Sequence, residues 1–190
     1  MDAGRIEAAV REILAAIGED PHRAGLDQTP RRVAESFTEL FSGLGASAAE
    51  HLADAELIES SAGQRSELVL MRNIDFRSMC EHHLLPFSGH AHVAYIPRDR
   101  IAGLGRLPRV VDTLASRPQL QERLTEEIAN VLQAGLDPLG VLVVLDATQS
   151  CVTHRGTRQA RAETVTMASR GVLREPTERA EVLALISSRS

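Results

Sequence analysis

Hydrophobic residues recur at helical spacing near the start of the chain. Between residues 6 and 17 they lie three and four positions apart, which predicts an amphipathic helix over 3–17 that stops at Gly18. A second helix is predicted to open at Thr29 and Pro30, with Thr29 as the N-cap and Pro30 in the first turn. This second helix is expected to end at Gly43.

A third and weaker helix is expected over residues 47–57, with Ser47 as its candidate N-cap. The polar segment 61–67 that follows has no apolar periodicity, which is typical of a loop. We therefore predict two parts, an N-terminal helical segment, 1–62, and a second domain, 63–190.

The hydrophobic pattern of the second part alternates between strand and helix periods. Short runs rich in apolar and branched residues predict strands over 68–74, 90–96, 141–148 and 163–168. Helical spacing predicts helices over 107–114, from Pro118 to Gly135, and over 177–186. Because the strands come in pairs, we expect antiparallel hairpins with the helices on one face, which is an α+β fold. We expect so small a sheet, polar on one side, to be completed by neighbouring subunits.

Composition and charge narrow the possible partners. The 190 residues include no apolar run near the roughly 18 that a membrane span needs, and the N-terminus has no apolar stretch of a secretory signal. We therefore expect a cytoplasmic protein without a membrane partner. A net charge of −5 and the absence of tryptophan argue against nucleic acid. Local basic clusters suit a small anionic ligand, although a solvated charged face is the simpler interpretation of any one of them: Arg98, Arg100, Arg106, Arg109, Arg155, Arg158 and Arg161.

The two cysteines, Cys80 and Cys151, lie far apart in the sequence. They could be idle core residues, a disulfide or two ligands of one metal, and a cytoplasmic location argues against the disulfide. His83 follows Cys80 at a spacing that one turn can bring to a single ion. Two Cys and one His make a catalytic zinc set with a fourth position for water, whose pKa zinc lowers toward about 7. The alternative is a buried cysteine beside surface histidines.

Two further side chains have chemistry that suits such a centre. His82 would lie beside the metal without binding it, and its ordinary pKa of about 6.5 suits proton transfer. Glu122, next to Gln121, could accept the paired N–H groups of a guanine-type edge. The simpler interpretations are a solvent histidine and a solvated glutamate.

Several segments together resemble the GTP cyclohydrolase I family. They occur in family order from about residue 18 to the C-terminus: EDPHRAGLDQTPRRV, SMCEHHLLPFSGHAHVAYIP, QERLTEEIA, CVTHRG and ETVTMASRGVLRE. The resemblance implies the tunnelling fold (T-fold), an antiparallel sheet backed by helices, for the catalytic domain 63–190. It also implies a ring-shaped homodecamer with active sites between subunits.

The resemblance also implies roles for individual residues. It assigns Zn²⁺ to Cys80, His83 and Cys151, the guanine of GTP to Glu122 with Gln121 beside it, and the triphosphate to Arg106, Arg109 and Arg155. The family usually has Ser-Lys where this chain has Gly105-Arg106. Arginine keeps the positive charge and adds a fork suited to phosphate oxygens, but one hydroxyl donor is lost.

The family reaction adds water at C8 of guanine, releases formate and recloses the ring as 7,8-dihydroneopterin triphosphate. Two family histidines move protons, and they correspond here to His82 and Gln149. Glutamine can donate and accept hydrogen bonds but cannot take or supply a proton near pH 7. On an extended segment His154 would point away from Cys151, so it replaces the lost histidine only if the turn at Arg155 redirects it.

Four hypotheses therefore stand on sequence grounds. The first is an ordinary zinc-dependent GTP cyclohydrolase I. The second is a divergent member, acting on GTP or a related purine nucleotide, that stops at a ring-opened formamidopyrimidine or a C8-modified nucleotide because of Gln149. The third is a non-catalytic relative that binds a guanine nucleotide, and the fourth and weakest is a pterin synthase on the same fold. Retention of the three metal ligands and His82 favours chemistry over binding alone.

Overall fold

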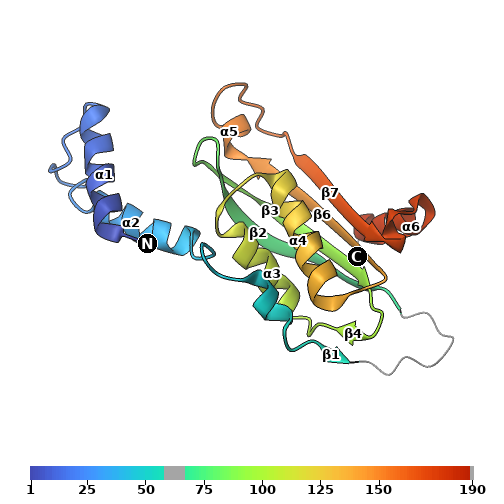
Figure 1. Cartoon of the computed structure of the whole chain (residues 1–190). Helices are drawn as coiled ribbons and strands as arrows, with labels where there is room; N and C mark the ends of the chain where they lie inside the picture. Colours follow the sequence, from blue (N-terminus) through green and yellow to red (C-terminus); the bar gives the residue numbers. More distant parts are fainter. Residues whose placement is uncertain (58–66, 189–190) are drawn as a thin grey trace.

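The computed structural model describes residues 1–57 and 67–188 (Figure 1). Its first two helices, α1 (Ala3–Ala16) and α2 (Thr29–Leu40), stand beside the main body as a pair. Both predicted helices form, but α2 ends at Leu40 rather than at Gly43, and Thr29 is not the N-cap. Gln28 holds that position, and Pro30 lies in the first turn as expected.

The segment after α2 differs from its prediction. The helix expected over 47–57 is wrong, because only a 3₁₀ helix, η1 (Ala48–Leu52), forms, and strand β1 (Glu56–Leu57) follows it. Ala48 and Leu52 are buried in the main core, so packing sets the conformation there. Strand β1 pairs antiparallel with β4 (Arg100–Ile101). Except for Glu67, the predicted loop 61–67 lies outside the described residues, as does the predicted boundary at 62.

The main sheet has five strands in the order β5-β2-β3-β6-β7. The strands are β2 (Val69–Cys80), β3 (Pro86–Ile96), β5 (Pro118–Gln119), β6 (Gly140–Gln149) and β7 (Thr164–Gly171). All neighbours are antiparallel except β5 and β2. The register places Phe87 of β3 opposite Gln149 of β6. The two predicted hairpins, β2–β3 and β6–β7, are confirmed.

Strands β2 and β3 are longer than predicted. The sequence pattern ended the first strand at Ile74, where charged residues begin, but Phe76 and Cys80 continue the buried side while Asp75 and Arg77 point to solvent. This alternation is that of a strand with one solvated face.

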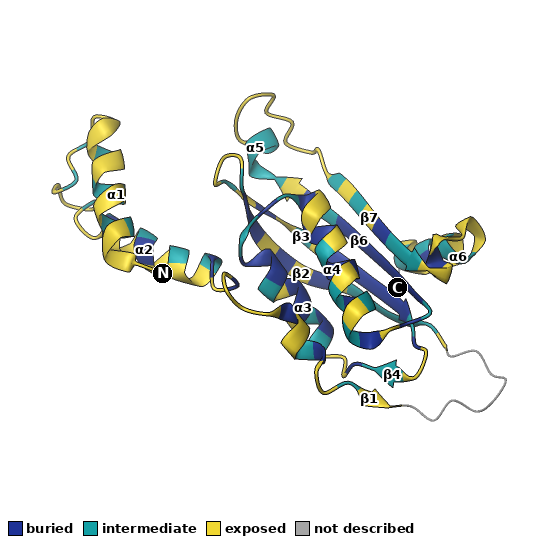
Figure 2. Ribbon diagram, in the orientation of Figure 1, coloured by how far each residue is buried: buried dark blue, intermediate teal, exposed yellow. Residues whose placement is uncertain are grey.

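Helices α3 (Arg106–Ala115) and α4 (Gln121–Leu136) cover one face of the sheet (Figures 1 and 2). The core between them and the sheet is apolar and fully closed, with Leu124, Ile128, Leu132, Val143 and Leu145 among its members. Helix α4 does not end at Gly135. A Cβ there would lie 2.7 Å from Leu52 Cδ1, so the glycine admits η1, and Asp137 with φ 44° terminates the helix.

The remaining short elements are α5 (Ser150–Thr153) and η2 (Val172–Arg174), and α6 (Pro176–Ser187) closes the chain. Helix α6 packs on the opposite face of the sheet, in a second small core made by Ala94, Leu142, Val144, Leu173 and Val182. The prediction that all helices lie on one face is therefore wrong for α6. None of the described helices is long and apolar enough to span a membrane.

Gly89 of β3 lies directly against the backbone of β6. A Cβ at this position would overlap the carbonyl oxygen of Asp146 and lie 2.7 Å from the Cα of Ala147. We expect Gly89→Ala to lower the free energy of unfolding by about 3 kcal/mol, since backbone atoms cannot move aside cheaply. Urea unfolding measures this change.

Gly103→Ala is the matched control for this substitution. The nearest atom to a Cβ at Gly103 is Arg106 Cγ at 3.9 Å, which is ordinary contact. Equal unfolding midpoints for the two variants would contradict the close approach of the strands.

Candidate functional site

A tight turn between β2 and β3 brings Cys80 and His83 together. Cys80 is the last residue of β2, and its N–H donates to Leu85 O at 2.9 Å. The N–H of Leu84 donates back to Cys80 O at 2.8 Å, with Leu84 in the left-handed region at φ 50°. This closed turn holds the two candidate ligands on one side.

The same turn is fastened to the rest of the molecule. The Glu81 N–H donates to Gln119 O at 3.0 Å, which joins the turn to β5. The Arg123 guanidinium lies 2.6 Å from the Glu81 carboxylate, and this hydrogen bond lowers the pKa of that carboxyl. His82, the next residue of the turn, lines a pocket.

Cys151 reaches the same place from the end of β6. Gln149 ends that strand, and α5 begins at the next residue, with Thr153 Oγ1 donating to Gln149 O at 3.2 Å. The extended segment assumed for His154 is therefore wrong, because residues 150–153 are helical. His154 is exposed and hydrogen-bonded to Thr153 Oγ1 at 2.7 Å.

The donor atoms of Cys80, His83 and Cys151 all lie within 4.8 Å of one another. Burial raises the pKa of the Cys151 thiol, the neighbouring Cys80 sulfur raises it further, and the charge of Arg155 lowers it. Two sulfurs held this close resist losing both protons, and a bound cation would favour the deprotonated form that coordination requires. The donor set fits zinc, for which Cys₂His with one open position is a known catalytic arrangement.

The two cysteines line a pocket of about 420 Å³. Its walls come from the end of β2 and the turn after it, from β5 and the start of α4, from the end of β6 and α5, and from the start of β7. The lining residues are Cys80, His82, Gln119, Leu120, Gln121, Glu122, Gln149, Cys151 and Thr164. Six of the site residues predicted from the sequence are thus in one pocket, and His83 joins them through its contact with the two cysteines. Glu122 is exposed in the first turn of α4.

Gln121 lies deeper than its neighbour Glu122. It is 3% exposed, and its Nε2 donates to Leu145 O at 3.2 Å and to Thr164 O at 2.9 Å. Its Oε1 accepts from Gln149 Nε2 at 2.7 Å. Gln121 thus binds the protein with both ends of its amide, while its predicted contact with substrate stays a prediction.

Sequence reasoning missed three wall residues, Gln119, Leu120 and Thr164. Gln119 is 2% exposed, and its Nε2 donates to Leu114 O at 3.1 Å and to Glu127 Oε2 at 2.9 Å. Within the described chain its Oε1 has no hydrogen-bond partner. The only sequence signal that could have found Gln119 is its place two residues before Gln121. Nothing in the sequence singled out Thr164.

The predicted phosphate-binding arginines lie elsewhere. Arg106 and Arg109 line a separate pocket of about 330 Å³ with the glycine-rich segment before α3, and Arg106 pairs with Asp54. Arg155 is exposed on the loop after α5. A single chain therefore brings neither Arg106 nor Arg109 to the pocket that holds the cysteines.

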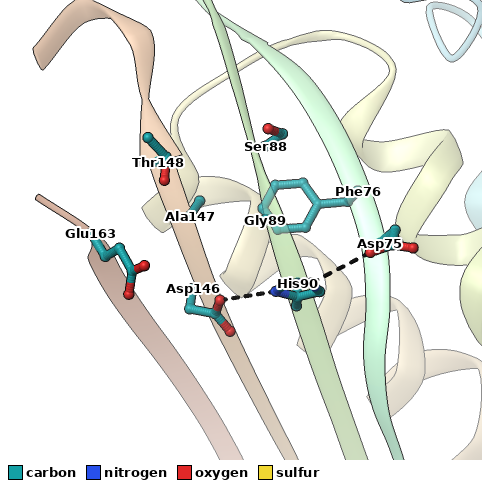
Figure 3. A pocket seen from close by; sticks show the side chains of 9 residues that line it. All are labelled: Asp75, Phe76, Ser88, Gly89, His90, Asp146, Ala147, Thr148 and Glu163. Carbon is teal, nitrogen blue, oxygen red and sulfur yellow. Dashed lines mark hydrogen bonds and ion pairs between the residues drawn. The ribbon is translucent and has the colours of Figure 1, made fainter. Parts of the chain in front are cut away.

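A third pocket of about 400 Å³ lies on the open face of the sheet (Figure 3). There the His90 ring lies between two carboxylates, 3.2 Å from Asp146 and 3.5 Å from Asp75, with Glu163 across the pocket. None of the predicted site residues lines it. The cysteine pocket is therefore the stronger candidate for chemistry.

The fold and the cysteine pocket define an α+β protein with a candidate Cys₂His metal centre. The family profile described as GTP cyclohydrolase I matches residues 6–187. A GTP cyclohydrolase 1 of Leifsonia xyli subsp. xyli is 58% identical over 97% of this chain and 95% of its own length. One from Bacillus subtilis is 52% identical over 94% of this chain and 93% of its own length.

The chain therefore belongs to the GTP cyclohydrolase I family. Its sheet of antiparallel hairpins backed by helices is the tunnelling fold expected for that family. Among solved structures, the archaeosine synthase QueF-Like in the apo form matches 57% of this chain and 97% of its own. The TM-score of 0.48 and 21% identity are too low to support an argument.

Proposed function

We propose that this protein is a zinc-dependent hydrolase that attacks C8 of the guanine ring of GTP and releases formate on the way to 7,8-dihydroneopterin triphosphate. One observation carries the proposal. The donor atoms of Cys80, His83 and Cys151 lie within 4.8 Å of one another, at a pocket that Glu122 also lines. Family membership supplies the substrate class.

Cys80, His83 and Cys151 would hold the zinc ion. When bound, zinc supplies a Lewis acid that activates water for attack near neutral pH. The chain's part is to fix the three donors, and it does so with the hydrogen-bonded turn after β2 and with α5. Rigid strands and a closed turn hold such a set more firmly than a loop would.

Glu122 would anchor the guanine. Its carboxylate lies in the first turn of α4, where the helix dipole favours negative charge, and can accept N1–H and one N2–H hydrogen together. His82, on the same pocket, would carry protons to and from the reacting ring. The purine would then be held between the carboxylate and the metal.

The triphosphate-binding residues support a site shared between subunits. Arg106 and Arg109 line a different pocket from the cysteines. In the described chain β7 pairs only with β6. Apart from β3, β2 pairs only with the two-residue β5. Both edges of the sheet therefore have backbone groups that a neighbouring subunit could pair with. We include in the proposal a homodecamer in which a neighbour's arginines complete each site, together with Arg155 from the same chain.

The location that we propose is the cytoplasm. Both cysteines are unpaired in the structure, and a reducing compartment keeps thiols in the form that binds metal. GTP is the proposed partner there, and neither a membrane nor nucleic acid is part of the proposal.

Product analysis tests this function. Zinc-loaded protein with GTP should release formate and, after oxidation, give a fluorescent pterin. Glu122→Gln should lower kcat/KM about 10²-fold, since it weakens charge-assisted bonds to guanine. Glu126→Gln, one turn further along α4 and paired with Arg170 at the surface, is the matched control.

The outcomes separate the hypotheses. Zinc-loaded protein that binds GTP without releasing formate would overturn the proposal in favour of a binding protein. Formate without a pterin would show that the reaction stops after ring opening, as expected if Gln149 cannot replace a proton carrier.

A further inference from the structure

The hydrogen bonds of Gln121 fix the orientation of two amide groups. One end of the Gln121 amide faces the carbonyl oxygens of Leu145 and Thr164, at 3.2 and 2.9 Å. Carbonyl oxygens only accept, so that end must be the nitrogen. The oxygen of Gln121 then faces Gln149, which must offer its own nitrogen, at 2.7 Å. Backbone chemistry, rather than an arbitrary choice of amide orientation, therefore decides both side chains.

The anchor of this chain of bonds is rigid. Gln121 is the first residue of α4 and is 3% exposed. Thr125 Oγ1 donates to Gln121 O at 2.7 Å and lies 2.6 Å from Thr166 Oγ1, which ties this turn of the helix to β7. Gln121 is thus held by β6, β7 and its own helix.

We propose that Gln121 is a positioning residue that forces the side chain at position 149 to give its donor to Gln121 and its acceptor to the pocket. For Gln149 the acceptor is the amide oxygen, because its nitrogen only donates and gives one of its two N–H groups to Gln121. Gln149 is half-buried and lines the pocket with Cys151 and Glu122, so an acceptor there meets a ligand's N–H or a bound water.

The proposal deepens the proposed function and rests on it for the identity of the ligand. The pocket would offer acceptors from two directions, the Glu122 carboxylate and the Gln149 oxygen, which matches a purine rich in N–H donors. An imidazole in place of Gln149 would fall under the same constraint. It would donate one N–H to Gln121 and present its unprotonated nitrogen to the pocket, where it could take up a proton.

A double-mutant cycle tests the positioning role. Gln149→His should raise pterin formation about 10²-fold, the usual scale of general acid–base help. In a Gln121→Met background the same substitution should gain no more than about threefold, because the two positions are coupled. Among variants that release formate, an equal effect in both backgrounds, including no effect in either, would overturn the proposal. Zinc content and the thermal midpoint check that Gln121→Met is folded.

A second measurement requires neither Gln121→Met nor turnover. In ¹⁵N-histidine-labelled Gln149→His protein, the new imidazole should show a single tautomer with a slowly exchanging N–H. A tautomer mixture like that of the exposed native His22, or coordination of the new ring to zinc, would contradict the proposal. If the tautomer is fixed but no variant releases formate, the proposed function fails and the positioning role stands.

Discussion

Replacing Cys151 with alanine should remove zinc from the protein and stop formate release from GTP. The Cys151 sulfur is one of three donor atoms that lie within 4.8 Å of one another. The two donors that remain are too few to hold the ion. Loss of a Lewis acid worth several kcal/mol lowers the rate by more than about 10³-fold. Metal analysis of the purified protein and a formate assay measure both effects.

The matched control for this variant is Ser150→Ala, one residue earlier in α5. Ser150 does not line the pocket, and the helix uses its backbone oxygen, which accepts from His154 N–H at 3.0 Å. This variant should keep its zinc and its activity. A Cys151→Ala protein that retains a full complement of zinc would contradict the assignment of Cys151 as a zinc ligand.

Replacing His82 with asparagine should lower formate release by about 10²–10⁴-fold while zinc stays bound, because general acid–base transfer is lost and the metal donors are not. His82 lines the pocket but is not part of the three-donor cluster. Asparagine can still form hydrogen bonds at a similar distance from the backbone. The loss of activity therefore measures proton transfer rather than the positioning of the ligand.

Two other histidine variants are the controls for His82→Asn. His83→Asn should lose zinc as well as activity, since His83 belongs to the donor cluster. His90→Asn, on the open face of the sheet, should keep both (Figure 3). If His82→Asn released formate at the parent rate, the proton-carrying role would be excluded.

The strongly periodic segments were predictable from the sequence. Helix α4 and strand β6 bury continuous apolar patterns, and their existence and type follow from spacing alone. The ends of β2 and β3 were not predictable, because Asp75 and Ser88 project from the solvated face and resemble loop residues in a linear sequence. Tertiary packing decided the 3₁₀ conformation of η1 and the sheet face on which α6 packs, neither of which local propensity can indicate.

The part of the candidate site that depends on a short spacing in the sequence was predictable. Cys80 and His83 meet through one turn, while Cys151 as a third ligand was one of several open alternatives until the family resemblance favoured it. The roles of these residues stay predictions. Gln119 and Thr164 could not be foreseen, because their place in the pocket depends on how β5 and β7 are aligned with the neighbouring strands.

The register of β3 with β6 has an evolutionary consequence. Because Phe87 pairs with Gln149, the number of residues along the paired strands β2, β3 and β6 decides where Cys80 lies relative to Cys151. Deleting one residue inside β6 would turn every side chain beyond it to the other face, so Gln149 would leave the pocket. Insertions and deletions that preserve the metal cluster are therefore restricted to the connecting loops, such as 154–163, where added length changes no strand pairing.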